Sequence, residues 1–303
     1  MIGEFTEKVR IYENIAKANG VEITQEIANT ICDYLTYEEQ IEENKTINEE
    51  KERIKELLNN QSMLKRCIKE RYGSFYFSYY NKMLNILKPQ YLTRALYLCS
   101  YMNYDNLLIE GKTHHKPIYE SDLIRIWNIS RAEMFNTKKE LIDLGILIVN
   151  ENKTLSISEN FCKKGELMKN IKDEKARIFN DAIREIYEKA KPSEHKKLAL
   201  LYKMLPYINL KWNMVCSNID EEIKDLVQPI DVKTLCKLLN QSNVTKLKKD
   251  LLSLTVNGRP VVLMASVMNK SIILINPAVY YKGTRLEDVD NIEEMINNIV
   301  SAV

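Results

Sequence analysis

The alternation of apolar and polar residues is clearest in residues 129–145, ISRAEMFNTKKELIDLG. Three apolar side chains gather on one side of a helical wheel, and polar side chains fill the other: Met134, Leu141 and Leu144. Ser130 has the position and chemistry of an N-cap, and Glu133 completes a capping box. Gly145 follows where a helix would end. The pattern therefore predicts an amphipathic helix.

The segments around this helix add further elements in a definite order. Residues 91–103 and 119–127 have apolar residues at helical spacing, and Asn128-Ile129-Ser130 predicts a tight turn. Two β-rich runs follow, ILIVN at 146–150 and TLSIS at 154–158, and they predict a hairpin. Helices joined by a tight turn and followed by a hairpin are the order of a winged helix-turn-helix.

The chain repeats this pattern. PIYESDLIRIWNIS, which begins at Pro117, matches PIDVKTLCKLLNQS, which begins 112 residues later at Pro229. KKELIDL matches KKDLLSL at an offset of 110, and LSISENFCKKG matches ILINPAVYYKG at an offset of 118. Upstream, ALYLCSYMNY resembles ALLYKMLPYI. Four blocks in the same order indicate an internal duplication, so a second winged helix-turn-helix is expected.

The second copy predicts the same elements, namely helices near 196–206, 231–239 and 243–255, a turn at 240–242, and a hairpin of 259–267 and 270–276. At an offset of 110, the inward positions in the last helix of the first copy correspond to those in the last helix of the second. They are Met134, Thr137, Leu141 and Leu144 in the first copy, and Val244, Leu247, Leu251 and Leu254 in the second. The predicted fold class is mainly α with small β-hairpins, with two winged helix-turn-helix domains in tandem and an N-terminal helical segment.

Five parts of the chain are expected: an N-terminal helical region at 1–87, a first winged-helix domain at 88–165 (the first copy), a linking helix at 166–194, a second winged-helix domain at 195–285 (the second copy), and a partly helical tail at 286–303. The linking helix is clearest at 174–192, where one face is apolar. Residues 38–58 are so charged that we expect a solvated helical pair, with a partner-binding or dimerising arm as the alternative.

Charge is unevenly distributed along the 303 residues. Residues 1–60 contain 14 acidic and 7 basic residues, a net charge of −7, whereas the remainder contains 28 and 37, a net charge of +9. A basic body of this kind suggests a polyanionic partner. The polar N-terminus does not resemble a secretory signal, and no apolar run reaches the roughly 20 residues of a membrane span. A soluble cytoplasmic protein with no membrane partner is therefore expected.

The last helix of each copy has a polar and basic outward face, which suits double-stranded DNA. In a helix-turn-helix the second helix enters the major groove, where Arg and Asn read base edges and Lys contacts phosphates. Lysine and arginine residues in the hairpins would lie along the DNA backbone or in the minor groove. The predicted DNA-binding residues are Ser130, Arg131, Asn136, Lys138, Lys139, Lys153, Gln241, Ser242, Asn243, Thr245, Lys246, Lys248, Lys249, Arg259 and Lys270. Lys163, Lys164, Lys282 and Arg285, just beyond the hairpins, are interpreted in the same way.

Each of these features has a simpler structural interpretation. Solvated helices commonly carry lysine on the outside, and winged helices also serve as protein-binding modules. Phe135, an apolar residue on the polar face, suits either a thymine methyl group or packing against the N-terminal segment. The aromatic run at 71–84 could stack single-stranded bases, but core packing against the first winged domain is the preferred interpretation.

The motifs of common enzyme classes are absent from the sequence. There is no phosphate-binding GxxxxGK[ST] loop, no HExxH and no GxSxG. The six cysteines are scattered without a CxxC pair, and four have apolar neighbours, which favours reduced core thiols. His114 and His115 are interpreted as part of a solvated loop. We expect a protein that is not an enzyme, with no catalytic residues, no metal site and no cofactor.

Two phrases carry a resemblance to a known family: LPYINLKWNMVCSN at 205–218, followed by PIDVKTLCKLL, and the closing INPAVYYKG at 275–283. They resemble winged-helix proteins of plasmids and phages of Gram-positive bacteria, including RepL-type replication proteins, over about residues 90–285. The first copy has SENFCKKG where the second has the Asn-Pro motif. The resemblance implies binding to repeated sites at a replication origin and recruitment of host replication proteins.

Three functions follow as hypotheses. The first is an initiator that binds repeats at a plasmid or phage origin. The second is a transcriptional regulator of a mobile element that uses the same surface. The third is an adaptor whose winged domains bind protein. A homodimer is possible under any of them.

Overall fold

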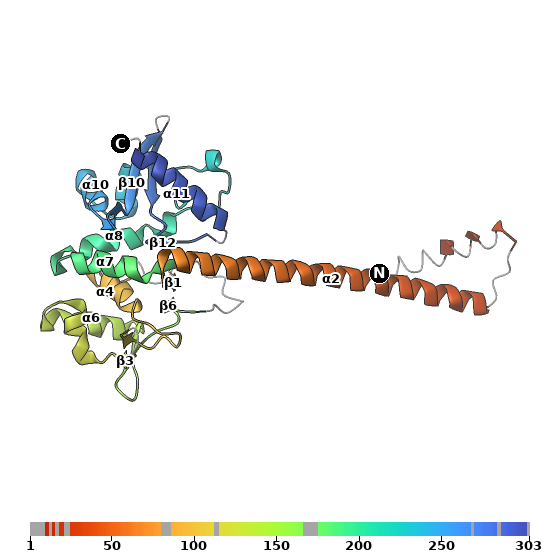
Figure 1. The fold of residues 1–303 in the computed structure, drawn as a ribbon, viewed down its shortest axis with the longest axis horizontal. Helices are drawn as coiled ribbons and strands as arrows, with labels where there is room; N and C mark the ends of the chain where they lie inside the picture. The colour runs from red at the N-terminus through yellow and green to blue at the C-terminus, as the bar shows by residue number, and fades with distance from the viewer. Residues whose placement is uncertain are drawn as a thin grey trace. The chain divides into compact units, whose positions relative to one another are not determined.

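The structure is a computed structural model that describes residues 10–11, 14–15, 18–20, 25–79, 86–111, 115–165, 175–267, 270–283 and 286–301. It is a mixed α/β fold with small antiparallel sheets (Figure 1). The chain divides into two compact units, residues 1–62 and 63–303, and each is described by itself. No helix within the described ranges has both the length and the apolar character that a membrane span requires.

The first unit contains most of α2 (Gln25–Tyr72), a helix of 48 residues that ends in the second unit. The predicted helical character is confirmed, but residues 38–58 lie within one continuous helix rather than a pair. This segment has no glycine or proline to break it. Its described side chains are exposed, and Ile41 and Ile47 are each 49% exposed. Acidic and basic residues form pairs one turn apart, such as Glu52 with Lys55.

The first half of the second unit contains these elements in chain order: β1 (Phe75–Tyr79), α4 (Pro89–Cys99), β2 (Ile109–Glu110), β3 (Lys116–Pro117), η1 (Glu120–Asp122), α5 (Leu123–Trp127), α6 (Arg131–Asp143), β4 (Leu147–Val149), β5 (Leu155–Ile157) and β6 (Cys162–Lys163). The three predicted helices and the hairpin of the first copy are confirmed as α4, α5, α6 and β4–β5. Leu123, Trp127, Leu141 and Ile157 are among the residues that form their shared core.

The second half contains β7 (Lys175–Phe179), α7 (Asn180–Lys189), η2 (Pro192–Glu194), α8 (His195–Lys203), η3 (Leu205–Tyr207), η4 (Lys224–Leu226), α9 (Val232–Leu238), α10 (Val244–Leu252), β8 (Thr255–Val256), β9 (Arg259–Pro260), β10 (Val262–Val267), β11 (Lys270–Ile275), β12 (Tyr280–Tyr281) and α11 (Leu286–Ser301). The helices and hairpin predicted for the second copy are present as α8, α9, α10 and β10–β11. Helix α11 buries Val289, Ile292 and Ile296.

A four-stranded antiparallel sheet in the order β12-β7-β1-β6 was not predicted. Its strand β1 lies within the aromatic run 71–84, and all five of its residues are buried, as the core-packing interpretation expected. Its strand β7 corrects the predicted linking helix of 166–194 over residues 175–179, and α7 provides the helical part at Asn180–Lys189. Residues 166–174 of that prediction lie outside the described residues. Residues 175–179 are extended because they pair with β1 along their whole length, which outweighs their local helical pattern.

Equivalent hydrogen bonds appear in the two copies. Asn106 and Asn213 both have left-handed backbone conformations, with φ of +58° and +49°. The Asn106 side-chain amide donates to the carbonyls of Ile157 (3.1 Å) and Cys162 (2.7 Å). The Asn213 amide donates to the carbonyls of Ile275 (2.9 Å) and Tyr280 (3.1 Å). The acceptors differ by 118 in residue number, which is the offset of the closing sequence block.

The lysines beyond the hairpins have structural roles, which corrects their interpretation as DNA contacts. Lys164 and Lys282 also differ by 118 in number, and each ammonium group donates to backbone carbonyls. Lys164 bonds to Met102 at 2.6 Å, and Lys282, which is buried, bonds to Ile208 at 2.9 Å. Lys163 pairs with Glu159. Arg285 lies outside the described residues.

Candidate nucleic-acid interface

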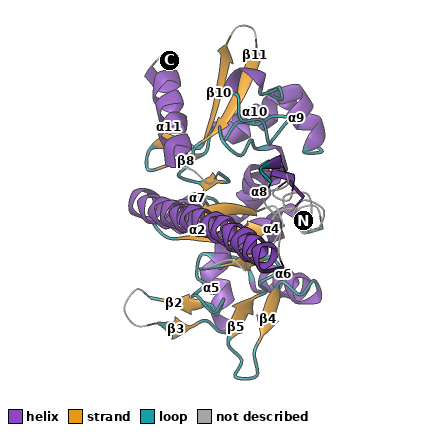
Figure 2. Ribbon diagram, turned by 90° about the vertical axis from the view of Figure 1, so that its right-hand side faces the viewer, coloured by secondary structure: helices purple, strands orange, loops and turns teal. Residues whose placement is uncertain are grey.

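The turn between α5 and α6 is built as the sequence predicts. Asn128 ends α5 in a left-handed conformation with φ of +50°, which suits asparagine better than most residues. The Ser130 hydroxyl then accepts a hydrogen bond from the Glu133 backbone amide at 3.3 Å, so Ser130 is the N-cap of α6. At the other end Gly145 has φ of +65°. The cap and the left-handed residues mark the start and the end of α6, which Figure 2 labels.

The turn between α9 and α10 has the same geometry. Asn240 has φ of +53°, and the backbone amide of Gln241 donates to the Cys236 carbonyl at 2.8 Å. In α10 the N-cap is Asn243, whose side-chain oxygen accepts from the Lys246 amide at 2.8 Å. The side-chain oxygen of Asn243 is therefore engaged in capping α10. Its side-chain amide nitrogen is the part left for other contacts.

The inward faces of the two helices agree with the prediction at most positions. Thr137 and Leu141 are fully buried in α6, and Leu247 and Leu251 in α10. The prediction is wrong for Val244, which is 36% exposed because it lies in the first turn of α10, beyond the packed part of the helix.

Most of the predicted DNA-binding residues are exposed. This set comprises Ser130, Arg131, Asn136, Lys139 and Lys153 in the first copy, and Gln241, Ser242, Asn243, Thr245, Lys246, Lys248, Lys249 and Arg259 in the second. The side chain of Lys270 lies outside what the structure describes. Phe135 is 56% exposed, so the predicted packing is not seen in the described residues.

Lys138 is in a different environment from the other lysines. Its side chain is only 15% exposed, and its ammonium group donates to the Glu120 carboxylate at 2.6 Å. The ammonium group also lies 5.6 Å from the centre of the Phe135 ring. Lys138 joins η1 to α6 and its charge is neutralised there, which argues against its predicted role as a DNA contact.

The two outward faces differ in charge. In α10, Lys246, Lys248 and Lys249 are exposed, and within the described part of the chain none forms an ion pair. In α6, the exposed cations are Arg131 and Lys139, and acidic residues are interspersed with them. The positive potential is therefore stronger around α10.

Sequence reasoning missed the buried arginine that holds α6 in place. Arg94, in the apolar helix α4, is 1% exposed. Its guanidinium donates to the Thr137 hydroxyl (2.8 Å), to the Glu133 carboxylate (2.8 Å) and to Nδ1 of His195 (3.2 Å). Glu133 is thus drawn into this pair instead of completing a capping box. The only sequence signal was one arginine in an apolar helix, PQYLTRALYLC.

His195 links this network to the second copy. Its ring stacks on Tyr187 with centroids 4.4 Å apart, and its carbonyl accepts from the Thr93 hydroxyl at 2.8 Å. Burial and the nearby Arg94 charge lower the pKa of His195 to about 4. The imidazole is therefore neutral at pH 7, as an acceptor for the Arg94 guanidinium must be.

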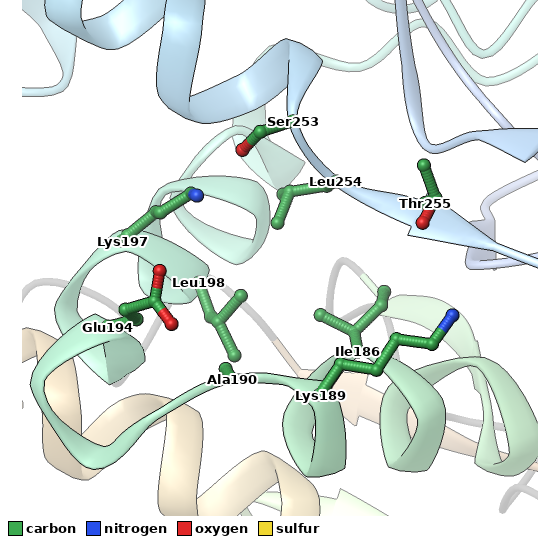
Figure 3. Close-up of a pocket in the computed structure, with 9 residues that line it drawn as sticks. All are labelled: Ile186, Lys189, Ala190, Glu194, Lys197, Leu198, Ser253, Leu254 and Thr255. Carbon is green, nitrogen blue, oxygen red and sulfur yellow. The ribbon is translucent and has the colours of Figure 1, made fainter.

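Small cavities lie between the helices of the second unit. One of about 140 Å³ lies between α7, α8 and the end of α10, and both charged and apolar side chains line it, among them Lys189, Glu194 and Leu198 (Figure 3). Lys189 already pairs with Glu185 at 2.5 Å. No cluster of His, Cys, Asp or Glu suited to a metal ion occurs among the described residues. His115 is exposed, and His114 lies outside the described residues.

Comparisons with known proteins give no relative: no family model, no curated protein and no solved structure matches this chain.

Proposed function

We propose that this chain is a sequence-specific double-stranded DNA-binding protein with two winged helix-turn-helix domains. The observation that carries the proposal is the pairing of two capped, exposed helices, α6 and α10, each preceded by a helix and a left-handed asparagine turn and followed by a hairpin. We call α6 and α10 the reading helices. Both have an apolar inner face and an exposed polar outer face with basic residues, which is the arrangement that enters a major groove.

The reading helices would contribute differently. Arg131 and Asn136 of α6 have the side chains that form bidentate contacts with guanine and adenine. Lys246, Lys248 and Lys249 of α10 suit phosphates, which supply affinity and salt dependence with little sequence information. The first copy would thus provide most of the specificity, and the second copy most of the electrostatic attraction.

Within this class, we propose replication initiation at a plasmid or phage origin. The support is the resemblance of residues 90–285 to RepL-type proteins and the presence of two domains that could hold successive grooves. Replication from a plasmid that carries only this gene and its flanking DNA would support the initiator. If that plasmid fails to replicate, and the protein still binds the flanking DNA and changes transcription from it, a regulator is the better description.

DNA binding itself can be tested by fluorescence anisotropy with the duplex that flanks the gene, over a salt series. We expect a steep linear decrease of log K with log salt for the full chain. Lys248→Ala/Lys249→Ala should reduce that slope by about 0.9 for each phosphate that the variant no longer neutralises. Lys69→Ala/Lys224→Ala removes the same charge from exposed positions in α2 and η4 and serves as the control.

A slope that falls equally in both double variants would show that only net charge matters. Absence of salt-dependent binding would exclude the proposal and favour the protein adaptor.

A further inference from the structure

The strand register of the four-stranded sheet is compatible with two-fold symmetry. Strands β1 and β7 pair antiparallel about their middle residues, Phe77 and Arg177. The outer strand β6 places Lys163 opposite Phe77, and the outer strand β12 places Tyr281 opposite Arg177. An antiparallel pair centred in this way has a two-fold axis perpendicular to the sheet. That axis passes beside the Phe77–Arg177 pair.

The same axis relates the two sequence copies. Lys163 and Tyr281 differ by 118 in number, as do the acceptors of the Asn106 and Asn213 hydrogen bonds. The inner strands β1 and β7 precede the first and the second copy, and the outer strands β6 and β12 close them. Exchanging the two copies together with their preceding strands leaves the strand order β12-β7-β1-β6 unchanged. The helices that open the copies, α4 and α8, also pack against each other, and the Thr93 hydroxyl donates to the His195 carbonyl.

The positions of the reading helices and hairpins agree with this symmetry. Both α6 and α10 lie on the side of the second unit away from β1 and β12 (Figure 1). The hairpin β10–β11 extends away from the centre of the unit at one end, and β4–β5 extends away from it at the other (Figure 2). If the two copies had the same orientation along the DNA, the hairpin of one copy would lie between the two reading helices.

We infer that one chain binds a bipartite DNA site whose two halves are read in opposite orientations. The inference rests on the proposed DNA-binding function and specifies its substrate: two half-sites of inverted polarity, contacted by α6 and α10 of the same molecule, with both hairpins at the outer flanks. A second copy of the chain is not needed to create the inverted arrangement, because the internal axis already provides it.

The half-sites need not have the same sequence. The residues on the outer faces differ: at the offset of 110, Asn136 in α6 corresponds to Lys246 in α10, and α10 has no arginine to match Arg131. One half-site is therefore read by side chains that discriminate purines, and the other mainly by lysines. A search for perfect palindromes would miss such a site, although its geometry is inverted.

The arrangement can be tested by tethered DNA cleavage. Single cysteines at Lys153→Cys and Ser266→Cys, at exposed positions in the two hairpins, would carry iron–EDTA. The parent for both would be the full chain with Cys67→Ser and Cys32→Ser. Cys67 is partly exposed, and the other cysteines with described side chains are buried. The probe DNA is the set of duplexes that the parent protein enriches from a random-sequence library.

We expect the two tethers to cut opposite outer flanks of the protected region, with the two patterns related by a two-fold axis at its centre. Strong cutting by one tether between the half-sites would overturn the inverted arrangement while leaving DNA binding intact. If no duplex is enriched and binding shows no salt dependence, the proposed function itself fails. The two failures are therefore distinguishable.

Discussion

The Glu133 carboxylate accepts a hydrogen bond of 2.8 Å from the Arg94 guanidinium, which is otherwise buried between α4, α6 and α8. Arg94 belongs to a core helix, and Glu133 to the first turn of a reading helix. This pair therefore connects the exposed α6 with the helix contact at the centre of the second unit. The stability of the core and the orientation of α6 depend on the same buried cation.

Replacing Arg94 should destabilise the protein strongly. Arg94→Met removes the partner of the Thr137 hydroxyl and of His195 Nδ1, so two buried polar groups lose hydrogen bonds. We expect a loss of about 2–4 kcal/mol in the free energy of unfolding, measured by urea denaturation. The matched control is Lys88→Met, which removes an exposed ion pair with Glu140 and should cost less than about 1 kcal/mol. Equal losses in the two variants would contradict the buried network.

Acidification should weaken the native state through His195. Its pKa is about 4 in the folded protein, below the unfolded value of about 6.5. Between these two values the unfolded chain binds a proton that the folded chain does not, so stability falls as pH decreases from 6.5 to 4. In His195→Asn, where an amide oxygen can replace Nδ1 as the acceptor for Arg94, this part of the pH dependence should disappear.

The measurement for His195 is the difference in unfolding free energy between the parent and His195→Asn at several pH values. Subtraction removes the contribution of the carboxylates, which titrate in the same range. If the unfolding free energies of the two proteins change with pH in parallel, the titration of His195 does not contribute to the pH dependence of stability.

Two neighbouring lysines should behave differently towards DNA. Lys139→Ala should weaken binding and lower the salt dependence, because Lys139 is exposed on α6. Lys138→Ala should leave the salt dependence nearly unchanged, because Lys138 is already paired with Glu120. Anisotropy titrations at several salt concentrations would measure both. A larger effect of Lys138→Ala than of Lys139→Ala would disagree with the placement of α6.

Arg131→Ala should change sequence preference more than affinity. Arg131 is exposed in the first turn of α6, where side chains of a reading helix approach base edges. Selection from a random duplex library should show relaxed preference in one half-site only, with a loss of about 1–3 kcal/mol against the preferred base. Relaxation spread evenly over both half-sites would argue against separate contacts by the two copies.

Local rules predicted the elements that depend on local interactions. Asn128, Ser130 and Gly145 marked the turn, the cap and the end of α6, because each of these residues acts through its own backbone or that of near neighbours. The repeat located α10 in the same way. The candidate interface was therefore largely predictable, apart from Lys138, whose partner Glu120 lies 18 residues away.

Elements that depend on distant partners were not predictable. All residues of β1 are buried, so the strand shows no alternation, and an apolar run of this length fits a strand or a helix equally well. Residues 175–179 continue a helical pattern and become a strand only because β1 lies beside them. Arg94 gave no hint that His195, 101 residues away, would be its acceptor.

The pairing of β1 with β7 also bears on how this molecule can change over evolutionary time. Each copy completes the other's sheet, so neither half can be lost, swapped for an unrelated segment or inherited alone without exposing a strand edge and its buried aromatic rings. Sequence changes between the two copies are therefore better tolerated on their exposed surfaces than in the shared sheet. Under the proposed function, the two copies could therefore come to prefer different DNA sequences while they remain joined through one sheet.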